Sequence, residues 1–271
     1  MSRMSPMVLS LTLAALPVCA QVASEPASTQ RSVVWLDQAP HSHGPIIGLQ
    51  KLFDGSVTSE NWSGYAVTGA ANSFTYAAGS WVVPAVTCAS RKASYAAFWV
   101  GLDGYNSSTV EQTGTLAECD KEKPIYFAWY EFYPAALTTI NTITVTPGDV
   151  MSAWVSYAND EFTTWLEDVT TGVTFSISSA VTGAERSSAE WIAEAPSSSS
   201  GVLPLADFGT ALFGTDSTGV AGTNCATAGG SCEPIGSYST WEAITMESRR
   251  KLEAVPSALS SDGTSFSVAY Q

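Results

Sequence analysis

The segment from Ser188 to Pro196 places two carboxylates within an apolar run and is the first candidate for chemistry in this chain. Read as a strand, it directs Glu190, Ile192 and Glu194 to one face, because alternate side chains of a strand point the same way. A carboxylate on a largely apolar strand is costly to bury unless it has partners or a catalytic task. The two acids lie four residues apart, about 13 Å along a strand, so they cannot both act on one bond.

Other catalytic groups are scarce. No histidine follows His43, so a Ser-His-Asp or Cys-His arrangement cannot be built in the rest of the chain. No glycine-rich phosphate loop follows a strand and opens a helix. What remains for catalysis is carboxylates, amides and hydroxyls.

The cysteines suit disulfides rather than a metal site. After the first twenty residues there are four, and an even number in an exported chain indicates two bridges. Three pairings are open, of which we favour Cys88 with Cys119 and Cys225 with Cys232. A zinc site is not expected, because no Cys-x-x-Cys spacing or histidine partner accompanies them.

The N-terminus is typical of an exported protein. Arg3, an apolar stretch over 7–16 and small residues before Gln21 predict a signal peptide over 1–20. This stretch is too short for a membrane anchor, so we expect a secreted protein with no membrane contact after signal removal. Residues 21–56 are mixed and predict a mostly irregular leader or propeptide, with a metal site at His41 and His43 as a weaker alternative. Residues 57–271 then form one domain.

The charge of the chain excludes several partners. The formal net charge is −14, from 25 acidic and 11 basic residues, which disfavours binding to nucleic acid or anionic membrane. With few Lys and Arg, little positive self-repulsion builds up when the carboxylates protonate, and this favours tolerance of acid. A monomer is the default expectation.

Short strand-like runs separated by Gly and Pro turns follow one another, and no segment has a 3.6-residue apolar period over a dozen positions. This pattern predicts an all-β antiparallel sandwich. The expected strands lie at 74–83, 95–102, 125–133, 143–146, 150–157, 162–169, 173–178, 189–194, 205–213, 241–246 and 265–269.

Four segments combine polar and aromatic residues in a fixed order: Trp-Val-Gly-Leu-Asp-Gly (99–104), Val-Glu-Gln-Thr-Gly (110–114), Ala-Trp-Tyr-Glu-Phe-Tyr-Pro (128–134) and Ala-Glu-Trp-Ile-Ala-Glu (189–194). With Asn-Trp-Ser-Gly-Tyr (61–65) before them and Ala-Asp-Phe-Gly (206–209) after, they resemble the glutamic peptidases, the eqolisin family. The resemblance extends from about residue 61 to the C-terminus. It implies a concanavalin-like sandwich of two large sheets with a groove on a concave face. It also implies secretion with a propeptide, acid-acting cleavage of polypeptides, no cofactor and insensitivity to pepstatin.

By the same resemblance the catalytic pair is Gln112 and Glu194. The groove residues of the family fall on Trp99, Asp103, Trp129 and Glu131, and Glu190 is expected to be a supporting acid near the sheet end. The chain departs from the family pattern at two positions. It has Glu111 where the family has Leu before the catalytic Gln, and it has Ala195-Pro196 after Glu194 where the family has an acid. Glu111 would point away from Gln112, so we expect an intact site. For Asp103 two roles stay open, a turn residue before Gly104 or an orienting hydrogen bond to Gln112 or its neighbour.

This pair suits peptide hydrolysis. A carboxylate partly ionised in mild acid can take a proton from water and return it to the departing amine. A Gln amide can hold the water through its oxygen and stabilise the oxyanion through its NH₂ group. Two alternatives remain: a glycoside hydrolase that uses two carboxylates such as Glu131 and Glu194, and a non-catalytic carbohydrate-binding module.

Overall fold

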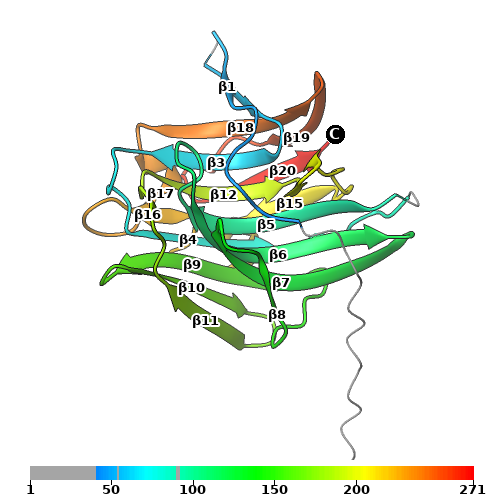
Figure 1. The fold of residues 1–271 in the computed structure, drawn as a ribbon, viewed down its shortest axis with the longest axis horizontal. Helices are drawn as coiled ribbons and strands as arrows, with labels where there is room; N and C mark the ends of the chain where they lie inside the picture. The colour runs from blue at the N-terminus through cyan, green and yellow to red at the C-terminus, as the bar shows by residue number, and fades with distance from the viewer. Residues whose placement is uncertain (1–40, 54, 90–91) are drawn as a thin grey trace, which may run out of the picture. The chain divides into compact units, whose positions relative to one another are not determined.

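The computed structural model describes residues 41–53, 55–89 and 92–271; the expected signal peptide over 1–20 and the leader over 21–40 lie outside the described residues. The described chain is nearly all β, with strands β1–β20, one helical turn α1 (Thr215–Thr218) and one 3-10 turn (Ile235–Ser237) (Figure 1). The predicted all-β antiparallel class is confirmed. No helix in the described ranges is long and apolar enough to cross a membrane.

One layer, which we call the front sheet, contains the segments singled out for chemistry. Its neighbouring strands are antiparallel throughout. In spatial order they are β18 (Trp241–Ser248), β3 (Trp62–Thr68), β12 (Ser188–Glu194), β5 (Ser94–Leu102), β6 (Val110–Asp120), β7 (Lys123–Tyr133) and β8 (Thr138–Ile140).

The other layer, the back sheet, is also antiparallel. Its order is β11 (Val173–Ser179), β10 (Glu161–Asp168), β9 (Val150–Ala158), β4 (Tyr76–Val82), β15 (Thr210–Phe213), β20 (Phe266–Tyr270) and β19 (Lys251–Pro256). Strand β18 joins the layers, because its first half pairs with β3 and its end pairs with β19. The short strands are β1 (Gln50–Lys51), β2 (Val57–Ser59), β13 (Ser197–Ser198), β14 (Gly201–Val202), β16 (Cys225–Thr227) and β17 (Glu233–Pro234).

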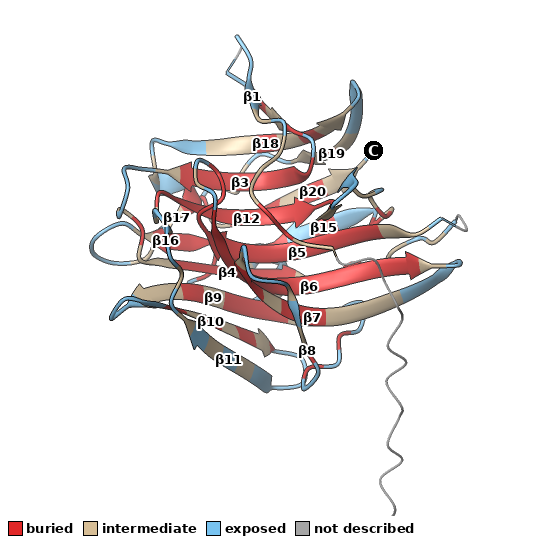
Figure 2. Ribbon diagram, in the orientation of Figure 1, coloured by how far each residue is buried: buried red, intermediate tan, exposed pale blue. Residues whose placement is uncertain are grey.

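Strand β12 shows how the sequence pattern positions the site. Trp191 packs into the large hydrophobic cluster between the layers, together with Trp81 and Phe98. Ile192 belongs instead to a second cluster on the other face, which contains Trp62, Trp99 and Trp129. The predicted alternation of β12 is therefore confirmed, and the middle strands of the front sheet are buried on both faces (Figure 2). Part of the cover on the second face comes from Ile46 and Leu49, which lie in the segment predicted to be the leader.

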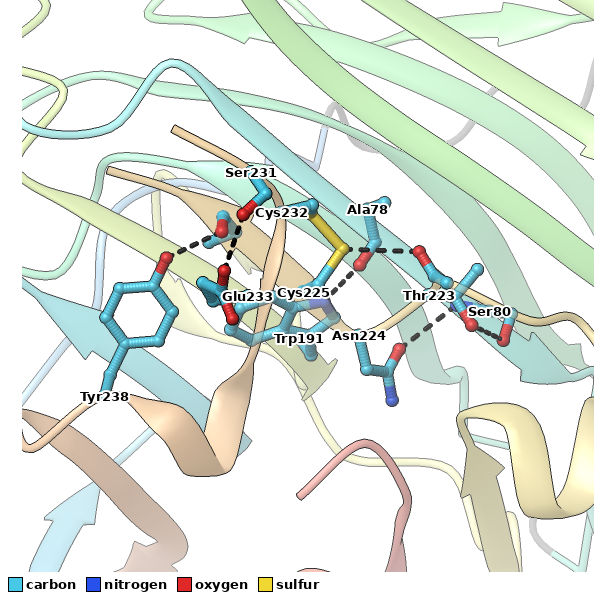
Figure 3. Close-up of a disulfide and its surroundings, with 12 residues drawn as sticks. Ala78, Ser80, Trp191, Thr223, Asn224, Cys225, Ser231, Cys232, Glu233 and Tyr238 are labelled. Atoms are coloured by element: carbon cyan, nitrogen blue, oxygen red, sulfur yellow. Dashed lines mark hydrogen bonds between the residues drawn. A yellow bond between two sulfur atoms is a disulfide. The ribbon is translucent and has the colours of Figure 1, made fainter. Parts of the chain in front are cut away.

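Both predicted disulfides are confirmed. Cys88–Cys119 closes a separation of 31 residues and Cys225–Cys232 one of 7. The second bridge lies at β16, which pairs with β4 (Figure 3). Next to it the Tyr238 hydroxyl donates to the carbonyl of Ala226 at 2.6 Å, and Trp191 Nε1 donates to the carbonyl of Ala78 at 2.7 Å. The pairing of β16 with β4 therefore attaches the loop after β15 to the back sheet, and the Trp191 bond joins β12 to β4.

Two expected strands differ from the structure. Residues 143–146 are irregular, although Ile143 and Val145 are buried, because their alternating apolar side chains fill the core edge without a partner strand. Of the strand expected over 205–213, only Thr210–Phe213 forms. Strand β6, which contains Gln112, was not among the expected strands, since polar residues interrupt its apolar pattern.

Candidate active site

The register of the front sheet brings the predicted site residues to one face. Across β12, β5, β6 and β7, one row consists of Glu190, Gly101, Gln112 and Glu131. Paired residues of neighbouring strands share a face, and so do residues two or four positions further along a strand. The rows Ile192–Trp99–Gly114–Trp129 and Glu194–Ala97–Leu116–Phe127 therefore lie on the same side of the sheet.

Gly114 opens this face between the two tryptophans. A Cβ at Gly114 would lie 2.2 Å from the carbonyl oxygen of Phe98 and 2.6 Å from Trp99 Cβ, so no side chain fits there. The rings of Trp99 and Trp129 thus flank a residue without a side chain. This arrangement supports the expectation that both tryptophans line a groove.

Glu194 is fully buried within a set of hydrogen-bond donors. Its Oε2 accepts a hydrogen bond from Trp99 Nε1 at 2.8 Å and lies 2.9 Å from His43 Nδ1. Burial raises the pKa of this carboxyl well above its usual range, and the side chains of Trp99, Trp62 and Asn61 act in the opposite direction. Its Oε1 has no well-formed hydrogen bond to any residue of the described ranges.

Gln112 is also fully buried, and its amide faces a peptide group. Nε2 donates to the backbone carbonyl of His43 and lies 3.4 Å from Glu131 Oε2. Its Oε1 has no hydrogen-bond partner in the part of the chain that the structure describes. The amide therefore offers a donor to a carbonyl oxygen and an acceptor for a further ligand such as water.

Glu131 contacts the same peptide from the neighbouring strand. Its Oε2 accepts the backbone N–H of His43 at 2.8 Å. Burial raises the pKa of Glu131 to about 8; the His43 N–H opposes this shift and the charge of Glu194 adds to it. Three predicted residues, Gln112, Glu131 and Glu194, thus converge on His43.

His43 is the site residue that no motif of the sequence predicts. Its ring is fully buried and stacks on Trp129, with ring centres 4.0 Å apart and planes 13° apart. Burial lowers the pKa of His43 to about 3. The signal available in the sequence is that the only two histidines of the chain precede an apolar stretch, Ile46-Ile47-Gly48-Leu49.

Asp103 contacts a loop and not Gln112. Its carboxylate accepts the backbone N–H groups of Glu185, Arg186 and Ser187 at 2.8, 2.6 and 2.8 Å. Its own φ is +69°, as expected of a turn residue. This carboxylate holds the loop that leads directly into β12.

Glu190 does not contact His43; the acids close enough to affect its charge are Asp103 and Glu111. Burial raises the pKa of Glu190 well above its usual range, Ser188 opposes the shift, and the charges of Asp103 and Glu111 add to it. Neither carboxyl oxygen of Glu190 has a well-formed hydrogen bond within the described ranges. Glu111 pairs in register with Leu102 and Phe132 of the large cluster, on the face opposite to Gln112 as expected, and burial raises its pKa to about 9.

The described residues contain no group of three or more His, Cys, Asp or Glu side chains that could hold a metal ion. The side chains around His43 instead offer one amide, two carboxyls and the flat faces of aromatic rings. Such a set can bind a peptide group and exchange protons with it.

Comparison with known proteins gives the family. The Peptidase A4 family model matches residues 60–266. The chain belongs to the Peptidase A4 family. The resemblance to glutamic peptidases is thereby confirmed.

Two curated relatives of this Peptidase A4 chain are fungal. Aspergillopepsin-2 of Aspergillus niger is 31% identical over 178 residues, which cover 57% of this chain and 62% of the relative. Scytalidopepsin B of Scytalidium lignicola is 31% identical over 172 residues, which cover 59% and 64%. The match therefore spans less than two thirds of the length of either relative.

A solved structure agrees over a larger part. The crystal structure of scytalido-glutamic peptidase with a transition state analog inhibitor is similar with a TM-score of 0.65 and 25% identity, over 78% of this chain and 98% of that one. The Peptidase A4 match includes Gln112, Glu131 and Glu194 and begins after His43. The segment with His43, which contacts these three side chains, therefore precedes the residues that match the family.

Proposed function

We propose that this protein is a secreted, acid-acting endopeptidase that hydrolyses polypeptides with Glu194 and Gln112. The observation that carries the proposal is the set of contacts around His43. Its carbonyl accepts a hydrogen bond from Gln112, its N–H donates to Glu131, and its side chain meets Glu194. A site that engages both the N–H and the C=O of one residue is suited to a peptide ligand.

In the proposed reaction Glu194 is the general base and then the general acid. It takes a proton from water and returns it to the departing amine. The pKa of Glu194 is raised by burial, and the leader contributes to that burial through His43. Water that reaches the carboxyl, beside a bound peptide or after the leader leaves, lowers its pKa toward the usual range, so the carboxyl ionises in mild acid. The indole N–H of Trp99 stabilises the ionised form.

Gln112 supplies the electrostatic part of the proposed reaction. Its NH₂ group donates to the carbonyl oxygen, on which negative charge develops as water attacks. Its Oε1, which has no hydrogen-bond partner among the described residues, holds the attacking water in this proposal. Glu131, whose pKa is about 8, is neutral in acid and fixes the backbone of the bound peptide.

The buried acids support an acidic working range. When folding raises the pKa of a carboxyl, that group does not affect stability at a pH below its unfolded-state pKa. As the pH rises from the unfolded-state pKa to the folded-state pKa, the group lowers the free energy of unfolding. Glu111 and Glu131, with pKa values of about 9 and 8 against 4.5, both act in this direction. Secretion is supported by the two disulfides and by the signal peptide expected over 1–20.

The test is hydrolysis of a denatured protein substrate in mild acid, with pepstatin present. We expect peptide-bond cleavage that pepstatin leaves unchanged and that is lost in Glu194→Gln and Gln112→Ala. Full activity of both variants would overturn the assignment of the pair. Release of reducing sugars from glycans without any peptide cleavage would instead favour the glycoside hydrolase alternative.

A further inference from the structure

Residues 41–49 cross the groove face of the front sheet in a defined register. At the N-terminal end, Ser42 and Ser197 exchange two backbone hydrogen bonds of 2.9 and 3.0 Å. Beyond the site, the backbone N–H of Ile46 donates to the carbonyl of Gly104 at 3.0 Å. The segment therefore passes over Gln112 and Glu194 as a peptide held on both sides.

The register selects one peptide bond. Gln112 Nε2 donates to the carbonyl of His43, and Glu131 accepts the N–H of the same residue. The carbonyl that receives the amide donor is the one polarised for attack. The peptide bond formed by this carbonyl joins His43 to Gly44.

We propose that the enzyme cleaves its own chain between His43 and Gly44, so that the mature protein begins at Gly44. This inference rests on the proposed peptidase function and adds to it the site of maturation. It moves the start of the mature chain from the expected position, residue 57, to a residue inside the leader.

The cleavage step needs only water. A water molecule next to Glu194 Oε1 gives a proton to the carboxylate and forms a bond to the carbonyl carbon of His43, while Gln112 stabilises the oxyanion. The C–N bond to Gly44 then breaks, and Glu194 returns the proton to the leaving nitrogen. The products are the carboxyl group of His43 and the amino group of Gly44. Oε2 is engaged by His43 Nδ1 and Trp99 Nε1, so Oε1 is the oxygen that acts.

The two products are held differently. Downstream of the bond, Ile47 donates its N–H to Asn61 Oδ1 at 2.7 Å and accepts the N–H of Glu60 at 2.8 Å. Asn61 Nδ2 also donates to the carbonyl of Pro45 at 3.4 Å. The new N-terminal segment therefore stays on the domain. Upstream, the described backbone contacts are those of Ser42 with Ser197 and of His43 with the site itself, so this product can leave and expose Glu194.

Gly44 suits the position after the cleaved bond. A Cβ there would lie 3.3 Å from Tyr133 Cε2 and 3.4 Å from Cζ, closer than comfortable packing. A larger residue at position 44 would push the ring or the peptide away, and would shift the His43 carbonyl from Gln112.

The test uses the full-length secreted chain, incubated in mild acid and followed by N-terminal sequencing and intact mass. We expect one stable product that begins at Gly44, at a rate independent of protein concentration. Glu194→Gln should stay uncut. Gly44→Pro should lose the cut between residues 43 and 44, whereas Phe53→Ala, at a fully exposed residue of the predicted leader, should be processed normally.

A stable N-terminus elsewhere, such as Val57, would overturn the inference, as would normal processing of Gly44→Pro at the same position. Each preparation is also assayed on a denatured protein. If the wild-type product hydrolyses this substrate but begins at another residue, only the cleavage site is wrong. If no preparation, processed by itself or by a second protease, hydrolyses the substrate, the proposed function fails. If Gly44→Pro does not fold, the wild-type N-terminus still decides the matter.

Discussion

Glu190 and Glu194 lie on the same strand and the same face, both are fully buried, and burial raises the pKa of both well above the usual range. They differ in their neighbours. Glu194 accepts a hydrogen bond from Trp99 and contacts His43 of the predicted leader. Glu190 has no well-formed hydrogen bond to its carboxyl oxygens from the described residues, and it lies near the acids Asp103 and Glu111.

The comparison shows that burial alone does not mark a catalytic carboxyl. Glu190 even shares a row with Gln112, with only Gly101 between them. Glu194 lies four residues further along β12, yet it is the acid that meets the same peptide residue as Gln112. Access to the bound peptide and polar donors that stabilise the charged form separate a proposed general base from a structural acid.

The largest expected effect separates the two glutamates directly. In enzymes whose leader has been removed by a second protease, Glu194→Gln should lower kcat on a denatured protein by at least about a thousandfold, because proton transfer to and from water is lost. Glu190→Gln is the matched control and should keep kcat within about threefold. Equal losses of kcat in the two variants would contradict the assignment of Glu194, and not Glu190, as the general base.

The next effect concerns the amide partner. Gln112→Ala should lower kcat by about a hundredfold to a thousandfold, the typical cost of removing one oxyanion donor. KM should change less, since Glu131 still accepts the peptide N–H. Thr113→Ala, on the same strand but the opposite face, serves as the control and should leave kcat nearly unchanged. A loss confined to KM would show that Gln112 only binds substrate.

A third prediction tests the structural acids by stability. The pKa of Glu111 is about 9 in the fold and 4.5 as its ordinary value, so folding is opposed increasingly as the pH rises from 4.5 toward 9. Glu111→Gln should therefore raise the free energy of unfolding by about 3 kcal/mol at pH 7 and change it little at pH 3. Thermal unfolding of both proteins from pH 3 to 8 measures this. A constant difference across that range would contradict the raised pKa.

The smallest expected effect concerns the hydrogen bond from Trp99 to Glu194. Trp99→Phe removes the indole N–H that donates to Oε2 but retains a ring in the groove. The pKa of Glu194 should rise, because the charged form loses a donor, so the acid limb of the pH–kcat profile should move to higher pH. We expect a shift of about one unit or less. A shift to lower pH would reverse the assigned role of Trp99.

Local regularities explain which features could be predicted. The two-residue alternation of β12 and the short separation of Cys225 from Cys232 are properties of neighbouring residues, and both are found in the structure. The assignment of Gln112 and Glu194 came from the order of several motifs, since no single segment indicates which acid meets the amide.

Long-range contacts explain what could not be predicted. His43 meets Glu194 across 151 residues of sequence, and Asp103 meets the loop before β12 across more than 80. Neither contact produces a periodic pattern in the sequence from which it could be predicted. Residues 143–146 had the alternation of a strand but no partner, because pairing depends on the whole sheet and not on the segment itself.

The most direct test of the central claim is a double-mutant cycle on kcat with Glu194→Gln, Gln112→Ala and the two combined, in each case after a second protease has removed the leader. If both groups act on one water and one carbonyl, the double variant should be no slower than Glu194→Gln within about threefold, because the first loss removes the reaction that the second group assists. Losses that multiply, or a Glu194→Gln enzyme that retains wild-type kcat, would contradict the claim.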